Sequence, residues 1–337
     1  GTLLATVTLL TVLVTAALVY VPWYLTATRN ISDTVRELDR QISSQVASEI
    51  ERLFSSAQSS VQALRTVLFQ RVISSTDAAK REFLFLAHLE SDPSLTWVSF
   101  GFPNGDFFGA YKPRDGGVKM VETQWDAEKK RAILRVDHYE SSDGDIWFQR
   151  RETGTSELFA PDLPWYRAGV ALGEATRATW TDIHALPIMD EYGISAAVPL
   201  RLFDKPVGVV SVSVGLSRIS AFLNTLPAVR SGNVFVVDRG GALVAAKTDT
   251  TAGSDAGIIR LQLALSRVAQ ENVNLATLNK VIQLEVEDLN DAKLFVGLSP
   301  VRKGTDSATS WTVITVIPAA DFVAAIDENN RQLAILL

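Results

Sequence analysis

The stretch VGVVSVSVGLSRISAFL, residues 207–223, changes its hydrophobic pattern halfway along. Its first half alternates two residue types, which is typical of a β-strand whose faces meet different surroundings: Val210, Ser211, Val212, Ser213 and Val214. The residues that follow, SRISAFLNTLPA, predict a helix. GISAAVPLRL, residues 193–202, predicts another strand just before. The alternation does not show which face of the strand lines a pocket.

The same period of two predicts an antiparallel sheet across residues 93–226. In SLTWVSFGFPNGDFFGAY, residues 94–111, two strands flank the turn PNGD. Further strands are predicted at residues 131–139, 145–152 and 178–185, and a short helix at residues 166–174.

A second, smaller α/β unit is predicted for residues 227–318. It opens with GNVFVVDRGGALVAA, a strand, a turn at Asp238–Gly241 and a second strand. A helix at about residues 257–280 and a closing strand pair, KLFVGLSPVR and SWTVITVIP, complete it. A final helix, residues 319–337, is expected to run back towards a membrane into a truncated second apolar segment.

The N-terminal end predicts a membrane anchor. Residues 2–25 carry no charge, and about 20 apolar residues suffice to cross a bilayer. Residues 1–26 are therefore expected to form a transmembrane helix, with Trp23 and Tyr24 at the interface. A cleaved signal peptide is the alternative, although its apolar core would be shorter.

Residues 27–92 predict one long amphipathic stalk helix. Apolar residues recur at steps of three and four, and neither Pro nor Gly interrupts residues 26–92. The stripe includes Ile42 and Val46. Because so long a stripe exceeds what one sheet can cover, we expect a second copy of the chain to pack against it, giving a homodimer.

These elements, in this order, resemble the double Cache (dCache) family of extracytoplasmic sensor domains. The resemblance covers residues 27–330 and rests on five motifs: PWY at 164–166, ATWTDIHALP at 178–187, YGISAAVPL at 192–200, VGVVSVSVGLSRISAFL at 207–223 and GNVFVVDRGGALVAA at 232–246. It implies an α+β fold in which two PAS-like antiparallel-sheet subdomains follow the stalk helix. The membrane-distal subdomain, residues 93–226, would bind a small molecule.

The resemblance also implies a location and an output. Such sensors sit in the inner membrane, with the Cache domain in the periplasm or outside the cell. A cytoplasmic output domain follows the second span. WTDIHALP and VSVSVGLSRISAFL look most like the sensors of membrane nucleotide cyclases, while chemoreceptors and histidine kinases use similar modules. A structural dimerisation ectodomain without a small ligand is the alternative.

The expected ligand-binding residues are Trp165, Tyr166, Tyr111, His184, Tyr192, Ser211 and Ser213. Trp165 and Tyr166 offer apolar area and a polar group each, as pocket walls do. The alternative is that Trp165 only packs its loop against the sheet and contacts no ligand. His184 could equally be a satisfied structural residue, and Tyr192 could belong to a solvated turn with Asp190 and Glu191.

The resemblance argues against a free α-amino acid as ligand. Family members that bind amino acids place an Arg before the Pro-Trp-Tyr motif, a Tyr and an Asp after the Trp-Thr pair, and an Asp in the later strand. This chain has Leu163, His184, Leu186 and Ser213 at those places. A carboxylate and an ammonium each need such partners. Arg135 or Arg150 could replace the missing anchor.

Composition and motifs set limits on other functions. The chain has 337 residues, a formal net charge of -6 and scattered Lys and Arg, which does not favour nucleic-acid binding. Absence of Cys excludes thiol catalysis and disulfides. His88, His138 and His184 are isolated, so no metal is expected. No hydrolase, zincin, kinase or cyclase signature occurs, so we expect no enzyme activity and no cofactor in this segment.

Overall fold

The structure is a computed structural model of the chain. It describes Leu18, Glu37 and residues 40–113, 116–142, 145–203, 205–225, 232–247, 254–287, 292–302 and 310–319. Apart from Leu18, the predicted transmembrane segment at residues 1–26 lies outside the described residues, as does the predicted return helix beyond Ala319. Within the described part of the chain, no helix has both the length and the apolar character needed to cross a bilayer.

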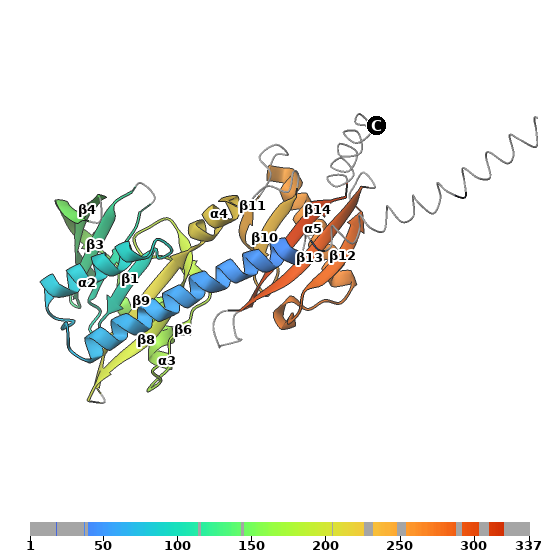
Figure 1. Cartoon of the computed structure of the whole chain (residues 1–337). Coiled ribbons are helices and arrows are strands. Elements are labelled where there is room, and N and C mark those ends of the chain that lie inside the picture. The colour runs from blue at the N-terminus through green and yellow to red at the C-terminus, as the bar shows by residue number, and fades with distance from the viewer. Residues whose placement is uncertain are drawn as a thin grey trace, which may run out of the picture. The chain divides into compact units, whose positions relative to one another are not determined.

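The described chain is α+β, contains two antiparallel sheets and divides into two compact units (Figure 1). The larger unit comprises Ser48–Thr225 and Val301–Trp311. The smaller unit includes Leu226–Pro300 and the segment from Thr312 onward, together with the chain before Ser48. The division inside the first half of the chain falls within one long helix, residues 40–69.

The larger unit is built on a nine-stranded sheet in the order β5-β4-β3-β2-β1-β9-β8-β6, and β7 also pairs with β8. Its strands are β1 (Trp97–Gly101), β2 (Phe107–Tyr111), β3 (Val118–Asp126), β4 (Arg131–Ser142), β5 (Asp145–Ser156), β6 (Thr179–Trp180), β7 (His184–Ala185), β8 (Tyr192–Leu202) and β9 (Lys205–Gly215). The strand pair predicted at residues 193–202 and 207–215 is confirmed as β8 and β9. β3 was not predicted.

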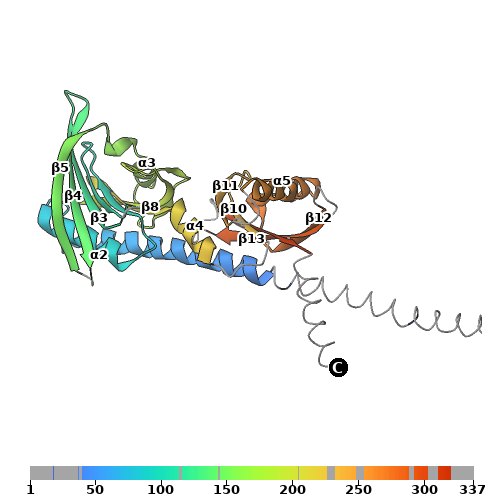
Figure 2. The same cartoon turned by 90° about the horizontal axis from the view of Figure 1, so that it is seen from above.

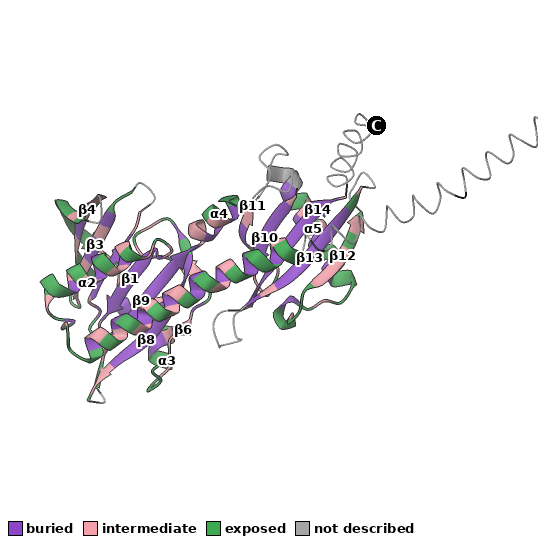
Figure 3. Cartoon of the chain, viewed as in Figure 1, coloured by how far each residue is buried: buried purple, intermediate pink, exposed green. Residues whose placement is uncertain are grey.

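Helices cover both faces of this sheet (Figure 2). The long helix and α2 (Ala78–Ser91) lie on one side, and α3 (Pro164–Ala171) lies on the other. α4 (Leu216–Thr225) continues directly from β9. Each central strand is therefore buried on both faces, as Figure 3 shows.

The prediction of one unbroken helix through residue 92 is wrong beyond residue 69. The helix ends with Arg71 in the left-handed region, at φ 56°. The backbone N–H groups of Arg71 and Val72 donate to the carbonyls of Leu68 and Val67, at 3.2 and 3.1 Å. These two bonds satisfy the last carbonyls without a glycine. Asp77 then begins α2, because its side chain accepts from the backbone N–H of Lys80.

The apolar stripe of the long helix is covered by the chain itself. Within the larger unit its members are at most 7% exposed: Ile50, Leu53, Ala57, Val61, Leu64 and Leu68. The stripe therefore does not require a second copy of the chain, contrary to the reasoning from the sequence. The earlier part of the predicted stalk, residues 27–39, lies outside the described residues except for Glu37.

The smaller unit has a five-stranded sheet in the order β11-β10-β14-β13-β12. Its elements are β10 (Asn233–Val237), β11 (Leu243–Lys247), α5 (Ser254–Gln270), β12 (Ile282–Glu287), β13 (Lys293–Arg302) and β14 (Ser310–Pro318). The helix predicted to reach residue 280 ends at Gln270, and β12 was missed. Leu261, Ala264 and Val268 of α5 pack with the sheet in one apolar core.

Candidate functional site

A row of small residues crosses the middle of the nine-stranded sheet. Ser99 of β1 lies opposite Gly109 of β2 and opposite Ser211 of β9, and Ser211 lies opposite Ala197 of β8. Residues directly opposite on antiparallel strands point to the same face of the sheet. We call Gly109, Ser99, Ser211 and Ala197 the floor.

Larger side chains stand on both sides of the floor. In the next row on one side, Trp97 lies opposite Tyr111 and Ser213, and the two rings stack at 4.5 Å between centroids. In the next row on the other side, Phe107 lies opposite Gly101. The register therefore places Ser211, Ser213 and Tyr111 on one face.

α3 covers this face with Trp165 and Tyr166. Pro164 occupies the first turn of the helix, where its missing N–H costs nothing. The two rings pack over Gly101, at which an added Cβ would lie 2.9 Å from Tyr166 and 3.0 Å from Trp165. We call Trp97, Phe107, Tyr111, Trp165 and Tyr166 the aromatic cluster. Trp165 is 1% exposed and Tyr166 is 6% exposed, so the cluster is closed over by its own rings.

A chain of hydroxyl and imidazole groups borders the floor. Ser213 Oγ lies 2.7 Å from Ser195 Oγ, which lies 3.2 Å from Nε2 of His184. Nδ1 of His184 lies 3.2 Å from Thr181 Oγ1 and 3.1 Å from the carbonyl oxygen of Asp182. Burial lowers the pKa of His184, so the imidazole is neutral at pH 7. These groups satisfy one another.

Ser211 differs from Ser195 and Ser213 on the same face of the sheet, and among the described residues it shares its unpaired state with Thr123 of β3. The Ser211 hydroxyl is buried and has no hydrogen-bond partner within the part of the chain that the structure describes. Leaving a buried polar group unpaired costs about 1–3 kcal/mol. Such a group in the centre of an aromatic cluster is a place where a polar atom of a bound molecule would gain a hydrogen bond.

Not every predicted residue belongs to the cluster. Trp165, Tyr166 and Tyr111 do, whereas Tyr192 is 59% exposed at the start of β8. Sequence reasoning missed Trp97 and Phe107, although the run Trp97–Gly101 was predicted as a strand.

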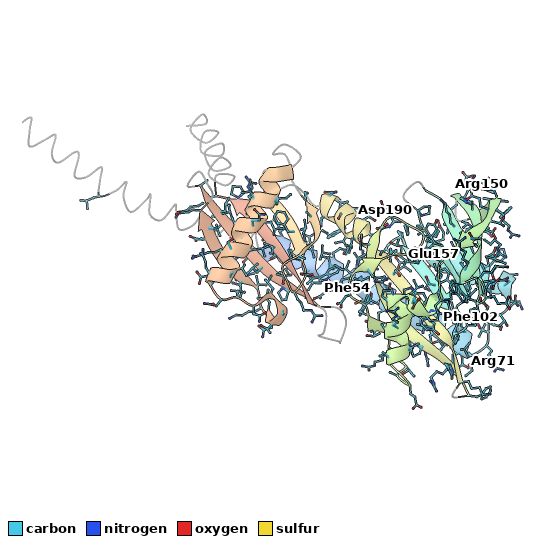
Figure 4. The ribbon with its side chains drawn as sticks, turned by 180° about the vertical axis from the view of Figure 1, so that it is seen from behind. Phe54, Arg71, Phe102, Arg150, Glu157 and Asp190 are labelled. Carbon is cyan, nitrogen blue, oxygen red and sulfur yellow. The ribbon has the colours of Figure 1, made fainter. Side chains whose placement is uncertain are left out.

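Neither arginine considered as a replacement anchor reaches the cluster. Arg135 points to the opposite face, where it contacts Glu82 of α2, Glu122 of β3 and Asp137 of β4 at 2.9 to 3.3 Å. Arg150 lies on the edge strand β5 and pairs with Glu152 at 2.9 Å (Figure 4). The sequence alone could not separate the two faces of these strands.

The Ser195–His184 pair does not make a hydrolytic site. Ser195 is fully buried, and Nδ1 of His184 faces a hydroxyl and a backbone carbonyl where a catalytic triad has a carboxylate. Across the residues described by the structure, no three His, Asp or Glu side chains gather as a metal site would need.

The sequence matches no family model and no curated protein. Solved structures do match. The ligand-binding domain of the Campylobacter jejuni chemoreceptor Tlp3, in complex with L-valine, is 14% identical with a TM-score of 0.57 over 87% of this chain and 96% of that one. The fold is that of Cache-type sensor domains.

Two other solved structures share this fold. The extracellular domain of soHK1S-Z6, assigned as a histidine kinase, is 15% identical with a TM-score of 0.53 over 88% of this chain and 98% of that one. Methyl-accepting Chemotaxis protein X is 14% identical with a TM-score of 0.53 over 85% and 97%. Such identities show a common Cache fold, and none of these structures is attached to a nucleotide cyclase by its description.

Proposed function

We propose that the larger unit is an extracytoplasmic small-molecule sensor, with the ligand bound between the floor and the rings of Trp165 and Tyr166. The unpartnered hydroxyl of Ser211 carries this proposal, because a ligand would satisfy it. The Cache fold supports a sensor that passes its state to a separate output domain. That output domain is a chemoreceptor, kinase or cyclase module on the far side of the membrane, and the sensor segment itself is not catalytic.

The ligand has an apolar body and few hydrogen-bonding groups, and it is not a free α-amino acid. The side chains of the aromatic cluster itself are uncharged, and Leu163 packs against it where an arginine anchor would be needed. Lys119 is the charged residue at its border, with Nζ 6.0 Å from the centroid of the Tyr111 ring. A buried carboxylate or ammonium without a partner costs several kcal/mol. The Tlp3 domain was solved with L-valine, so the fold accepts an amino acid and the exclusion rests on the side chains of this chain.

The closed state of the cluster favours a second function, that of a structural ectodomain without a small ligand. Trp97 and Trp165 are fully buried, as in a core that only stabilises the fold. A structural ectodomain would need nothing more. It does not account for the unpaired hydroxyl of Ser211, which a purely structural core would replace with alanine at no loss.

A thermal-shift assay with a panel of metabolites distinguishes the two functions. A ligand at about 100 times its dissociation constant stabilises the folded state by about 2.7 kcal/mol. We expect uncharged or weakly charged apolar metabolites to raise the melting temperature and common amino acids to leave it unchanged. Trp165→Ala should abolish the shift. Absence of any shift would favour the structural function, and a shift by amino acids that depends on Trp165 would refute the proposed ligand class.

A further inference from the structure

The aromatic cluster is covered on one side by the hairpin that joins β7 to β8. Leu186 of this hairpin is buried in the cluster, and the sulfur of Met189 accepts from Nε1 of Trp97 at 2.9 Å. We call residues 186–191 the cover. Its ends are tied by a bond of 2.8 Å from the N–H of Leu186 to the carbonyl of Glu191. Because rings and cover fill the space over the floor, a ligand can enter only if part of this covering moves.

The last residue of the cover reaches out of the cluster to α4. Glu191 is 6% exposed, and its Oε1 accepts from the backbone N–H of Ser217 at 3.2 Å and from the Ser217 hydroxyl. A carboxylate at this place satisfies a free N–H of the first helical turn and complements the helix dipole. Glu191 therefore acts as a helix cap supplied from a distant part of the chain.

The surroundings of Glu191 fit this contact closely. A Cβ added to Gly215 would overlap the Glu191 carboxylate, so only glycine at this position leaves room for it. A cleft of about 230 Å³ adjoins the contact and is lined by Lys112, Pro113, Glu191, Ser217, Arg218 and Ala221. Asp190, the neighbour of Glu191 in the chain, marks this region in Figure 4.

α4 is the last element of the larger unit before the chain enters the smaller one. It ends at Thr225, and the smaller unit resumes at Leu226. We infer that Glu191 is a positioning residue that couples the cover to α4, so that displacement of the cover by a ligand changes the start of the connecting helix. The role of a ligand in this inference rests on the proposed sensor function. The link between the cover and α4 can be tested without any ligand.

Amide hydrogen exchange of the full chain in detergent, without added ligand, tests the link. Glu191→Ala should speed exchange about tenfold or more, both in residues 216–219 and in residues 186–190, because bonds to a charged group are lost. Gly215→Ala should do the same without changing Glu191. Asp190→Ala, which removes an exposed carboxylate from the same hairpin, should change neither segment by more than about twofold.

The conservative variant separates coupling from packing. Glu191→Gln keeps an acceptor oxygen for Ser217, so both segments should exchange as in the wild type. Faster exchange confined to residues 216–219 in Glu191→Ala would reduce Glu191 to a simple cap and overturn the coupling. A Gly215→Ala protein with wild-type exchange, or a Glu191→Gln protein as fast as Glu191→Ala, would overturn it too. If Glu191→Ala does not fold, Gly215→Ala and Glu191→Gln decide the matter. A failure to bind metabolites would leave these exchange results unchanged, so the two hypotheses fail separately.

Discussion

Gly101 allows the rings of Trp165 and Tyr166 to pack closely against the sheet. Replacing it with alanine would place a methyl group 2.9 to 3.0 Å from Ala160, Tyr166 and Trp165. Overpacking of this kind costs about 1–3 kcal/mol. We predict that Gly101→Ala lowers the free energy of unfolding by that amount in a denaturant titration. Gly154→Ala on β5, where an added Cβ meets no atom within 4 Å, should change it by less than about 0.5 kcal/mol.

His184 makes stability depend on pH. Burial lowers its pKa in the folded state, so the unfolded chain binds a proton more readily. Stability from this source is present above the ordinary histidine pKa of about 6.5 and is lost as pH falls below it towards the folded value. We predict that the fall in melting temperature from about pH 7.5 to about pH 5.5 is smaller in His184→Gln than in the wild type.

Burial also lowers the pKa of His88, so some acid sensitivity should remain in the His184→Gln protein. His88→Gln measures the part of the acid sensitivity that His88 causes. An unchanged pH dependence in both variants would show that carboxyl groups alone cause the acid destabilisation.

Single residues were predictable where their chemistry alone decides their place. A Trp-Tyr pair at a helix start has to be buried against something, and both rings are in the cluster. For strands with alternating residue types, the side chains that face the cluster could not be predicted, because only the pairing register defines the two faces of the sheet. Ser211 is distinguished from Ser195 and Ser213 by the partner it lacks among the described residues, and Arg135 is excluded by the face on which it lies. Neither property can be read from the local sequence pattern.

At the scale of elements, α3 is the covering helix, and Gly169 lets it approach the sheet. A Cβ at Gly169 would overlap the Val209 side chain of β9. Inside a helix, alanine stabilises the folded state by about 1 kcal/mol relative to glycine. The overlap with Val209 destabilises it by about 1–3 kcal/mol. We predict that Gly169→Ala destabilises the protein in thermal unfolding and lifts α3 from the floor.

The clash itself is tested by a double variant. Val209→Ala should offset part of the loss, so Gly169→Ala with Val209→Ala should cost less than the sum of the two single changes. Strict additivity would mean that the two side chains do not meet.

Elements were predicted where the hydrophobic period was long and clean. β9 and α4 followed directly from the switch of period at residues 207–223, and β8 from the segment GISAAVPLRL just before. The helix end at Arg71 was missed because a non-glycine residue took the left-handed conformation, stabilised by two backbone bonds. β12, with the sequence IQLEVE, is an edge strand of half-buried and exposed residues, and no element was predicted for it between the helix at 257–280 and the strand KLFVGLSPVR.

For the whole molecule, the predicted homodimer must use a different face of the long helix. Val46 is buried, whereas the helix also borders a groove of about 860 Å³. The groove is lined by Ser55, Gln58, Ser59, Gln62, Ala63, Thr66, Val67, Arg177 and Ala178. Small side chains at Ser55, Ser59 and Ala63 permit close approach of a second helix. Because the chain has no Cys, a single introduced cysteine can form a disulfide only with the same cysteine of a second copy.

We predict that Ser59→Cys forms an intermolecular disulfide in membranes under mild oxidation. Val46→Cys should not, because its side chain is covered by the chain itself. Asp190→Cys, exposed on the β7–β8 hairpin, controls for random collision. Equal crosslinking at residues 59 and 190, or none at residue 59 in a folded protein, would contradict a dimer through this helix.

The architecture was predictable from the order of its parts, because each part has a local pattern and the family resemblance supplied their arrangement. The solved Cache structures confirm that fold. Ligand identity was not predictable, because it depends on which groups in a buried cluster are left without partners. Those groups become visible only when strands from different parts of the chain are brought into register.

The most direct test of a ligand site on the floor is a pair of measurements on Ser211→Ala. Its hydroxyl has no partner among the described residues, so its removal should leave the ligand-free melting temperature unchanged or raise it. For the metabolite with the largest thermal shift, isothermal titration should then show a dissociation constant about tenfold higher than in the wild type, because a polar atom of the ligand loses its hydrogen bond. Ser44→Ala, exposed on the long helix, should change neither value. A Ser211→Ala protein that is less stable without ligand, yet binds the metabolite with unchanged affinity, would contradict a ligand site on this floor.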